Sequence, residues 1–189
     1  IIYASRYFWI KGGLIALETL KKVKEKYPNV EIIFISNTPK EIIEKYDGIK
    51  FLGPTTQKNL FNYMAKSHIF FYPSLMDTFG FTLLEAMSFG LPTVTIYHPR
   101  GTPVIREIVE NRKSGFLVNF SKEKLDYYKI DKEEKELVNK LFEKLSLLIE
   151  NKKLREKMSK NCIQIIKKGK FSINERNKKL MKIYEEALK

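Results

Sequence analysis

Apolar and polar residues follow two different periods between Ile1 and Val118, which predicts strands and helices in turn. Short apolar runs bounded by Pro, Gly or Asn are typical of buried strands, and apolar residues three or four positions apart are typical of helices. The expected strands are Ile1–Ser5, Val30–Ile35, Ile49–Leu52, Ile69–Tyr72, Thr93–Tyr97 and Gly115–Val118. The expected helices between them are Gly12–Tyr27, Pro39–Tyr46, Thr56–Lys66, Phe81–Phe89 and Val104–Glu110.

The pattern changes to helices alone from about Lys132. One apolar stripe runs from Leu137 to Leu148 and a second from Leu154 to Ile166, each at helical spacing. Ser172 is a typical first cap for a last helix that reaches Leu188. We therefore expect one domain over residues 1–189, of which residues 132–189 form a helical C-terminal part.

Repeated strand–helix units with right-handed crossovers predict the fold class. The class is α/β, a doubly wound, Rossmann-like parallel sheet of six strands, for which the common strand order is 3-2-1-4-5-6. In such a sheet ligands bind where the order reverses, between the carboxyl ends of the first and fourth strands. The loops that follow those two strands are therefore the first place to look for chemistry.

Composition limits the class of protein. The chain has 189 residues, 43% apolar and 30% charged, which is typical of a soluble globular domain. No apolar run approaches the roughly 20 residues that span a bilayer. The single cysteine, Cys162, cannot form an internal disulfide, is expected in the core and agrees with a reducing cytoplasm. A start without Met, inside an expected strand, suggests a piece of a longer protein.

The net charge of +13 is concentrated in residues 151–189, which hold 13 Lys and Arg against 4 Asp and Glu. Such a surplus can indicate nucleic acid, an anionic membrane surface or an acidic partner, or simply a Lys-rich composition. The aromatic residues fall mostly in expected strands and apolar helix stripes, which argues against nucleic acid. A peripheral membrane contact stays open.

The loop after the first strand carries two cations and two glycines. Arg6 and Lys11 lie five positions apart and can close on one diphosphate, Arg as a bidentate fork and Lys as a point charge. Gly12 and Gly13 leave the start of the next helix free of side chains, so that backbone can approach an oxyanion.

The loop after the fourth strand reads Asp77-Thr-Phe-Gly-Phe-Thr-Leu-Leu-Glu85. Gly80 permits a sharp turn into a helix, where the N–H groups of Phe81 and Thr82 can point at phosphate. Glu85 lies further inside that helix and can accept hydrogen bonds from a ribose diol. The two loops together predict a nucleotide or sugar-phosphate site.

The two histidines offer little catalytic chemistry. His68 precedes a strand at an expected surface position, and His98 follows the fifth strand near the mouth of the crevice. The sequence contains neither a His/Cys cluster with metal-ligand spacing nor partners for a Ser-His-Asp arrangement, so no metal is expected. Phe8 and Trp9 either pack under their loop or face a partner domain.

Five motifs follow one another along the chain. They are Ser5-Arg6 with Lys11-Gly12-Gly13, Phe51-Leu52-Gly53, Asp77–Glu85, Ala86-Met87-Ser88-Phe89-Gly90-Leu91-Pro92, and Gly115-Phe116-Leu117-Val118. In this order they resemble the C-terminal, donor-binding half of retaining GT-B glycosyltransferases of family four (glycosyl transferases group 1). The resemblance covers nearly the whole chain, and it implies that an acceptor-binding N-terminal domain lies outside it.

The resemblance implies a role for each matching residue. Arg6 and Lys11 match the basic pair that binds the donor diphosphate and stabilises the departing nucleoside diphosphate. Glu85 matches the glutamate that holds the ribose, and Gly80-Phe81-Thr82 the backbone around phosphate and sugar. Gly53-Pro54-Thr55 matches the segment that lies against the nucleobase. Enzymes of this type usually need no metal, and two cations can take its place beside phosphate.

Two positions depart from the family pattern. Asp77 stands where the family usually has Glu, a residue that faces the transferred sugar, so its carboxylate is one methylene shorter. The glycine-rich turn after the fifth strand is replaced by the bulkier Tyr97–Pro103. Within it, Arg100 either touches phosphate or acceptor or belongs to a structural turn.

The resemblance implies a cytoplasmic hexosyltransferase that needs no cofactor. It would move a sugar from a nucleoside diphosphate donor to a glycan or lipid-linked acceptor, and the isolated chain would bind nucleotide without turnover. The alternatives are a non-catalytic module for nucleotide or nucleic acid, and another sugar-nucleotide enzyme such as an epimerase.

Overall fold

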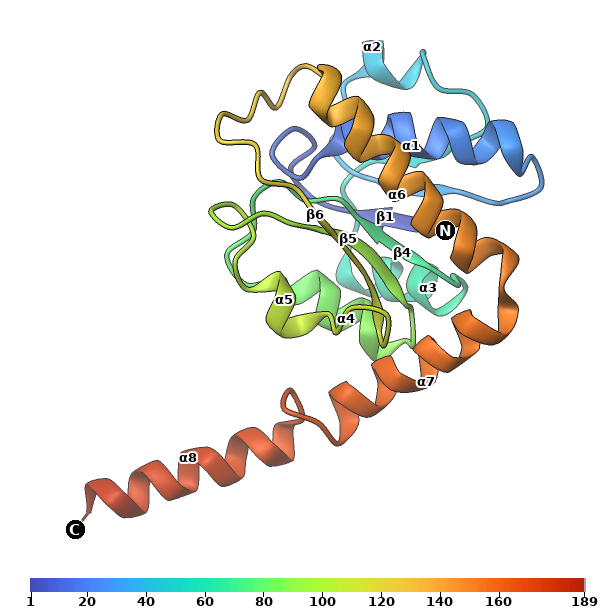
Figure 1. Cartoon of the computed structure of the whole chain (residues 1–189). Coiled ribbons are helices and arrows are strands. Elements are labelled where there is room, and N and C mark those ends of the chain that lie inside the picture. Colours follow the sequence, from blue (N-terminus) through green and yellow to red (C-terminus); the bar gives the residue numbers. More distant parts are fainter. Residues whose placement is uncertain (189) are drawn as a thin grey trace.

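A computed structural model describes residues 1–188 and contains one parallel sheet (Figure 1). Its six strands lie in the order β3-β2-β1-β4-β5-β6, which confirms the predicted order. The strands are β1 (Ile2–Ala4), β2 (Ile33–Ile35), β3 (Lys50–Leu52), β4 (Phe70–Tyr72), β5 (Thr93–Tyr97) and β6 (Gly115–Asn119). The order reverses between β1 and β4, so the carboxyl ends of these strands flank the expected crevice.

Strand ends differ from the prediction mainly at β2. The apolar run suggested a start at Val30, but the strand begins at Ile33, where Ile33 pairs with Ile2. The N–H of Val30 donates instead to the carbonyl of Tyr27, 3.0 Å away, and closes the turn after the preceding helix. Local turn chemistry therefore takes residues that periodicity alone assigns to the strand.

The helices alternate with the strands as predicted and then continue alone. They are α1 (Gly13–Lys26), α2 (Lys40–Ile43), α3 (Gln57–Ala65), α4 (Phe81–Ser88), α5 (Ile105–Ile108), α6 (Lys132–Glu150), α7 (Lys152–Lys167) and α8 (Ile173–Ala187). Side-chain caps start four of them, from Thr56, Asp131, Asn151 and the predicted Ser172. By contrast, α1 and α4 start at glycines in the left-handed conformation, without a side-chain cap.

Helices cover both faces of the sheet and bury two apolar clusters. On one face α1 and α6 pack over Tyr3, Phe34 and Phe71 (Figure 1). On the other face α3, α4, α5 and α7 enclose Phe70 and Tyr72. Alternate residues of each strand point to opposite faces, so the Phe70–Tyr72 run serves both clusters.

The last two helices behave differently. Helix α7 packs against α4, and its Cys162 is fully buried, which confirms the predicted core position. Burial raises the pKa of the Cys162 thiol to about 12. Helix α8 extends away from the body of the molecule (Figure 1) and contains no buried residue. Within residues 1–188, no helix combines the length and apolar character needed to cross a bilayer.

Candidate functional site

The loops that follow β1 and β4 meet at the carboxyl edge of the sheet, as predicted. The N–H of Met76 donates to the carbonyl of Ile10 over 3.2 Å. The Lys11 ammonium donates in turn to the carbonyl of Met76 over 2.7 Å. Backbone from two distant segments thus holds the predicted phosphate-binding lysine in place.

Lys11 also forms an ion pair with Asp77, with 3.2 Å between Nζ and Oδ2. Their side chains are only 16% and 9% exposed, so water screens this pair weakly. The hydroxyl of Tyr72 donates to the same carboxylate oxygen over 2.5 Å. Tyr72 was missed in the sequence, although a tyrosine that ends a strand at the ligand-binding edge is a usable signal.

The pKa values of Asp77 and Tyr72 move in opposite directions. Burial opposes ionisation of Asp77, but hydrogen bonds from Tyr72 and the charge of Lys11 outweigh it and lower the pKa of the carboxyl. Burial raises the pKa of Tyr72 well above its ordinary value, and the adjacent Asp77 charge raises it further. The site therefore contains an ionised aspartate, a neutral tyrosine and a lysine cation.

Asp77 also shapes the turn that begins α4. Its second oxygen, Oδ1, accepts from the N–H groups of Phe79, at 3.1 Å, and Gly80, at 2.9 Å. Gly80 has φ 87°, a conformation that favours glycine. The next two N–H groups, of Phe81 and Thr82, donate no hydrogen bond within residues 1–188. They are available to an anion, with the positive end of the helix dipole behind them.

Gly12 is required by the protein's own backbone. It has φ 69°, and a Cβ atom there would lie 2.0 Å from the carbonyl oxygen of Pro73. A Cβ on Gly13 would lie 2.3 Å from the ring of Phe8. Gly12 therefore lets the Lys11 loop approach the β4 loop, and Gly13 makes room for Phe8 within the Lys11 loop. Both reasons differ from the predicted room for an oxyanion.

A cavity of about 300 Å³ lies at the start of α4, and most of the other predicted site residues line it. Its lining includes Arg6, Pro54, Thr55, Thr82 and Glu85, which come from three separate segments of the chain. The half-buried Glu85 accepts a hydrogen bond from the side chain of Gln57, with 3.0 Å between Nε2 and Oε1. Gln57 is the second residue that the sequence analysis missed.

The turn after β5 packs against the Asp77 loop and holds it in place. His98 is buried; its Nδ1 accepts from the N–H of Gly101 over 2.9 Å, so Nε2 donates to the carbonyl of Lys122 over 2.8 Å. The carbonyl of Gly101 accepts from the N–H of Asp77 over 2.7 Å. His98 is therefore structural. Arg100 is exposed and pairs with Glu123 at 3.6 Å, which favours the structural-turn alternative.

Two aromatic groups take different positions around the site. Phe8 is buried, and Trp9 packs between it and Tyr128, with ring centroids 4.9 and 4.8 Å apart. These contacts favour the packing alternative for both residues. The Phe81 side chain is 70% exposed, and its ring centroid lies 4.5 Å from that of Phe79.

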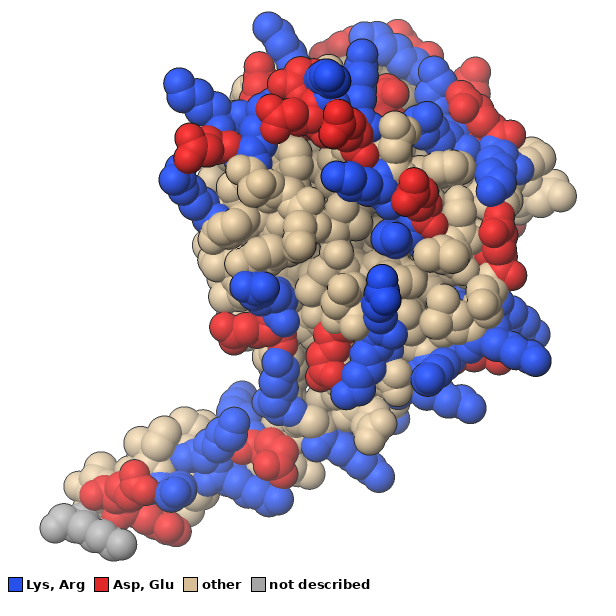
Figure 2. All heavy atoms as spheres, viewed as in Figure 1, with Lys and Arg blue, Asp and Glu red and all other residues tan. Residues whose placement is uncertain are grey.

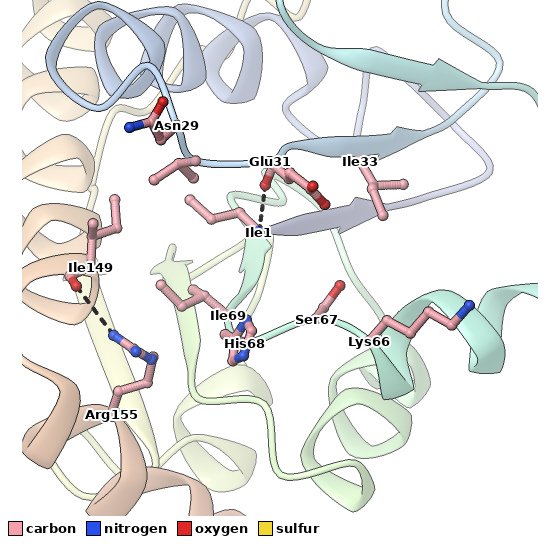
Figure 3. Close-up of a pocket in the computed structure, with 11 residues that line it drawn as sticks. Ile1, Asn29, Glu31, Ile33, Lys66, Ser67, His68, Ile69, Ile149 and Arg155 are labelled. Carbon is pink, nitrogen blue, oxygen red and sulfur yellow. Dashed lines mark hydrogen bonds between the residues drawn. The ribbon is translucent and has the colours of Figure 1, made fainter.

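A larger cavity of about 450 Å³ lies at the opposite, amino edge of the sheet (Figure 3). It is lined by Glu31, Lys66, the exposed His68 and Arg155. Arg155 donates to the carbonyls of Leu148 and Ile149 at the end of α6. None of the predicted site residues contributes to this cavity. Within residues 1–188, no group of His, Cys, Asp and Glu side chains could hold a metal ion.

The sheet order and the flanking helices define a class of fold, the Rossmann-like fold of GT-B glycosyltransferases. The fold is similar to that of the pneumococcal O-GlcNAc transferase solved with UDP and GlcNAc, with a TM-score of 0.77 at 22% identity over 99% of this chain and 35% of that one. A C-terminal domain of a group 1 glycosyl transferase from Francisella tularensis gives a TM-score of 0.67 at 24% identity, covering 91% of this chain and 86% of that one.

Residues 1–126 match the family described as "Glycosyl transferases group 1", and the chain belongs to this family. A curated relative, the sulfoquinovosyl transferase of Arabidopsis thaliana, is 39% identical over 108 residues, which are 55% of this chain and 21% of that protein. The chain spans about a fifth of the length of the first curated relatives it matches, between 21% and 23%.

Proposed function

We propose that this chain is the donor-binding half of a retaining glycosyltransferase that transfers a hexose. It would bind a nucleoside diphosphate sugar, and the remainder of the full-length protein would supply the acceptor site. The observation that carries the proposal is that Arg6, Thr82 and Glu85 line one cavity at the uncapped start of α4, while Lys11 pairs with Asp77 in the turn before that helix. Membership of a glycosyltransferase family supports the same chemistry.

Each part of the site has a role in this proposal. Lys11 and Arg6 bind the diphosphate and stabilise the charge that develops on it as the glycosidic bond breaks. The N–H groups of Phe81 and Thr82 add hydrogen bonds to phosphate oxygens. Glu85 accepts from the ribose hydroxyls, while Pro54 and Thr55 lie against the base. In this proposal these groups provide the electrostatic stabilisation themselves, without a metal.

The contacts of Asp77 suggest a more specific role than the one the family resemblance implies. The family resemblance places this acid opposite the transferred sugar, and that contact stays a prediction. Both of its oxygens already accept hydrogen bonds from Tyr72, Phe79 and Gly80, and one faces Lys11. We therefore propose that Asp77 acts mainly by positioning Lys11 and the turn before α4.

The acceptor would be a glycan or a lipid-linked glycan on the cytoplasmic side of a membrane, with the basic C-terminal helices near anionic lipid. Nucleic-acid binding is less well supported. On the face shown in Figure 2, Lys and Arg interleave with Asp and Glu around the body and form no continuous basic stripe.

Calorimetric titration of the chain with UDP, GDP and ADP tests the proposal. We expect one of them to bind saturably, and Glu85→Ala to weaken that binding about tenfold or more, because a hydrogen bond to a charged group contributes about 1.5–3 kcal/mol. Glu143→Ala, at an exposed position on α6, is the matched control and should bind like the parent. Absence of binding by all three nucleotides would contradict the proposal for this chain.

A further inference from the structure

Gln57 and Glu85 form a hydrogen-bonded pair that the roles above do not use. Gln57 is the first residue of α3, directly after the Thr56 cap, and Glu85 lies in α4, 28 residues further along the chain. The amide Nε2 lies 3.0 Å from Oε1 of the carboxylate. Both residues line the cavity of about 300 Å³ beside Arg6.

The partner of a half-buried carboxylate decides what else it can bind. Glu85 is only partly exposed, and the exposed Gln57 donates the one hydrogen bond that its carboxylate accepts within residues 1–188. A lysine or arginine in this place would form an ion pair and compete with a ligand for the carboxylate. A neutral amide fixes one oxygen and leaves the full negative charge on the group.

The pair also leaves acceptor capacity free. A carboxylate has about four lone-pair positions, of which the amide uses one on Oε1. Within residues 1–188, no further donor contacts the Glu85 side chain. Its second oxygen therefore remains free to accept from the two neighbouring hydroxyls of a ribose, a geometry that suits a carboxylate held in one rotamer.

We infer that Gln57 is a positioning residue that sets the orientation of Glu85 and thereby makes the site selective for ribose over deoxyribose. This inference rests on the proposed function and adds a specificity determinant to it. The local sequence supports it, because the Thr56 hydroxyl accepts from the N–H of Asn59 over 3.3 Å and so fixes the first turn of α3, from which Gln57 projects. The same turn directly follows Pro54-Thr55. The segment proposed to contact the base is therefore continuous with the residue proposed to orient Glu85.

The test compares three ligands on the parent chain, three variants and one control variant. The ligands are the nucleoside diphosphate that binds and its 2′-deoxy and 3′-deoxy forms. The proteins are the parent, Gln57→Ala, Glu85→Ala and the double variant. Lys58→Ala is the matched control, since it removes an exposed neighbour on the same turn. Circular dichroism spectra confirm that each variant is folded before calorimetric titration.

We expect the parent to prefer the ribose form by about tenfold, a factor that corresponds to one hydrogen bond to a charged group. Gln57→Ala should remove most of this preference while leaving affinity for the deoxy forms within about twofold of the parent. In the Glu85→Ala background, Gln57→Ala should add nothing, because the positioned group is gone. Lys58→Ala should keep the parental preference.

Other results would overturn the inference in distinguishable ways. Equal weakening of ribose and deoxy ligands by Gln57→Ala would show a contact elsewhere on the nucleotide. An unchanged preference in Gln57→Ala, with loss in Glu85→Ala, would show that Glu85 needs no positioning, and the proposed function would stand. No binding of nucleotide by the folded parent would remove the proposed function and this inference with it.

Discussion

The two edges of the sheet each carry a cavity. The larger of the two lies at the edge that holds none of the predicted site residues. The amino-edge cavity has about 450 Å³ and the carboxyl-edge cavity about 300 Å³. At the amino edge the cation of Arg155 already binds the last carbonyls of α6. At the carboxyl edge the N–H groups of Phe81 and Thr82 have no partner within residues 1–188.

The difference follows from the direction of the chain. In a parallel sheet with crossover helices, helices return antiparallel to the strands, so their positive amino ends lie at the carboxyl edge and their negative ends at the amino edge. A cation such as Arg155 satisfies a helix end internally, whereas an uncapped start such as that of α4 is open to an anion. Free backbone N–H groups at a helix start, more than cavity volume, distinguish the site.

The largest expected effect is the loss of stability when a glycine at either edge is replaced by alanine. Gly12, in the site, and Gly48, before β3, have nearly equal φ values of 69° and 72°. An added Cβ would meet the Pro73 carbonyl at 2.0 Å in the first case and the flexible end of Lys24 at 2.8 Å in the second. We expect Gly12→Ala to lower the free energy of unfolding by about 3–5 kcal/mol and Gly48→Ala by only about 1–2 kcal/mol. Urea unfolding of both variants measures the difference, and equal losses would show that φ strain alone matters.

The second expected effect follows from removing one cation at either edge, which should change nucleotide affinity at one edge and stability at the other. Lys11→Met keeps the apolar stem and removes the charge, so we expect nucleoside diphosphate to bind about 10–100-fold more weakly, the value of one charge-assisted hydrogen bond. Arg155→Met is the matched change at the amino edge. It should leave nucleotide affinity within about twofold and instead lower the free energy of unfolding by about 1–2 kcal/mol, because carbonyls at the end of α6 lose their donor. Calorimetric titration and urea unfolding separate the two outcomes, and loss of affinity in Arg155→Met would contradict the assignment of the edges.

The sequence was sufficient for what depends on repetition along the chain. Alternating apolar periods predicted the strands and helices, and the common strand order of a doubly wound sheet brought the Lys11 and Asp77 loops together. It did not predict contacts that depend on where a side chain ends in space. The hydrogen bond from Tyr72 to Asp77 joins a strand residue to a loop, and that from Gln57 to Glu85 joins two helices. Spacing contains no signal for such pairs.

The same limit explains the glycines. A Lys-Gly-Gly sequence predicts a helix start that backbone can approach, but not which neighbour approaches it. For Gly12 that neighbour is the Pro73 carbonyl, which belongs to the loop after β4. Likewise, the position of His98 after β5 placed it near the mouth of the crevice, and only its two ring contacts identify it as structural.

A third and smaller effect is expected from acid. Because the folded-state pKa of Asp77 lies below its ordinary value of 3.8, its charge contributes stability that is present above that pH. This contribution is lost as pH falls through the lower folded value. Asp77→Asn should therefore lower the free energy of unfolding by about 1–2 kcal/mol at pH 7, and the difference from the parent should narrow below pH of about 4. Urea unfolding at pH 7, 5 and 3 measures it; a difference that stays constant with pH would mean that the Asp77 charge adds nothing.

The smallest expected effect is on the rate at which a reagent labels the Cys162 thiol. Cys162 is buried at the amino edge, beneath the chain that leads into β5 and β6. Its sulfur lies 3.1 Å from the carbonyl oxygen of Ser114 and 3.6 Å from that of Leu91. Burial raises the pKa of the thiol to about 12, so at pH 8 almost no thiolate exists in the folded protein. We expect a thiol reagent at pH 8 to label the native chain only as fast as it unfolds, and nucleotide, by stabilising the folded state, to slow that labelling further. Rapid labelling in the folded state, indifferent to nucleotide, would show that the amino edge opens independently of the site.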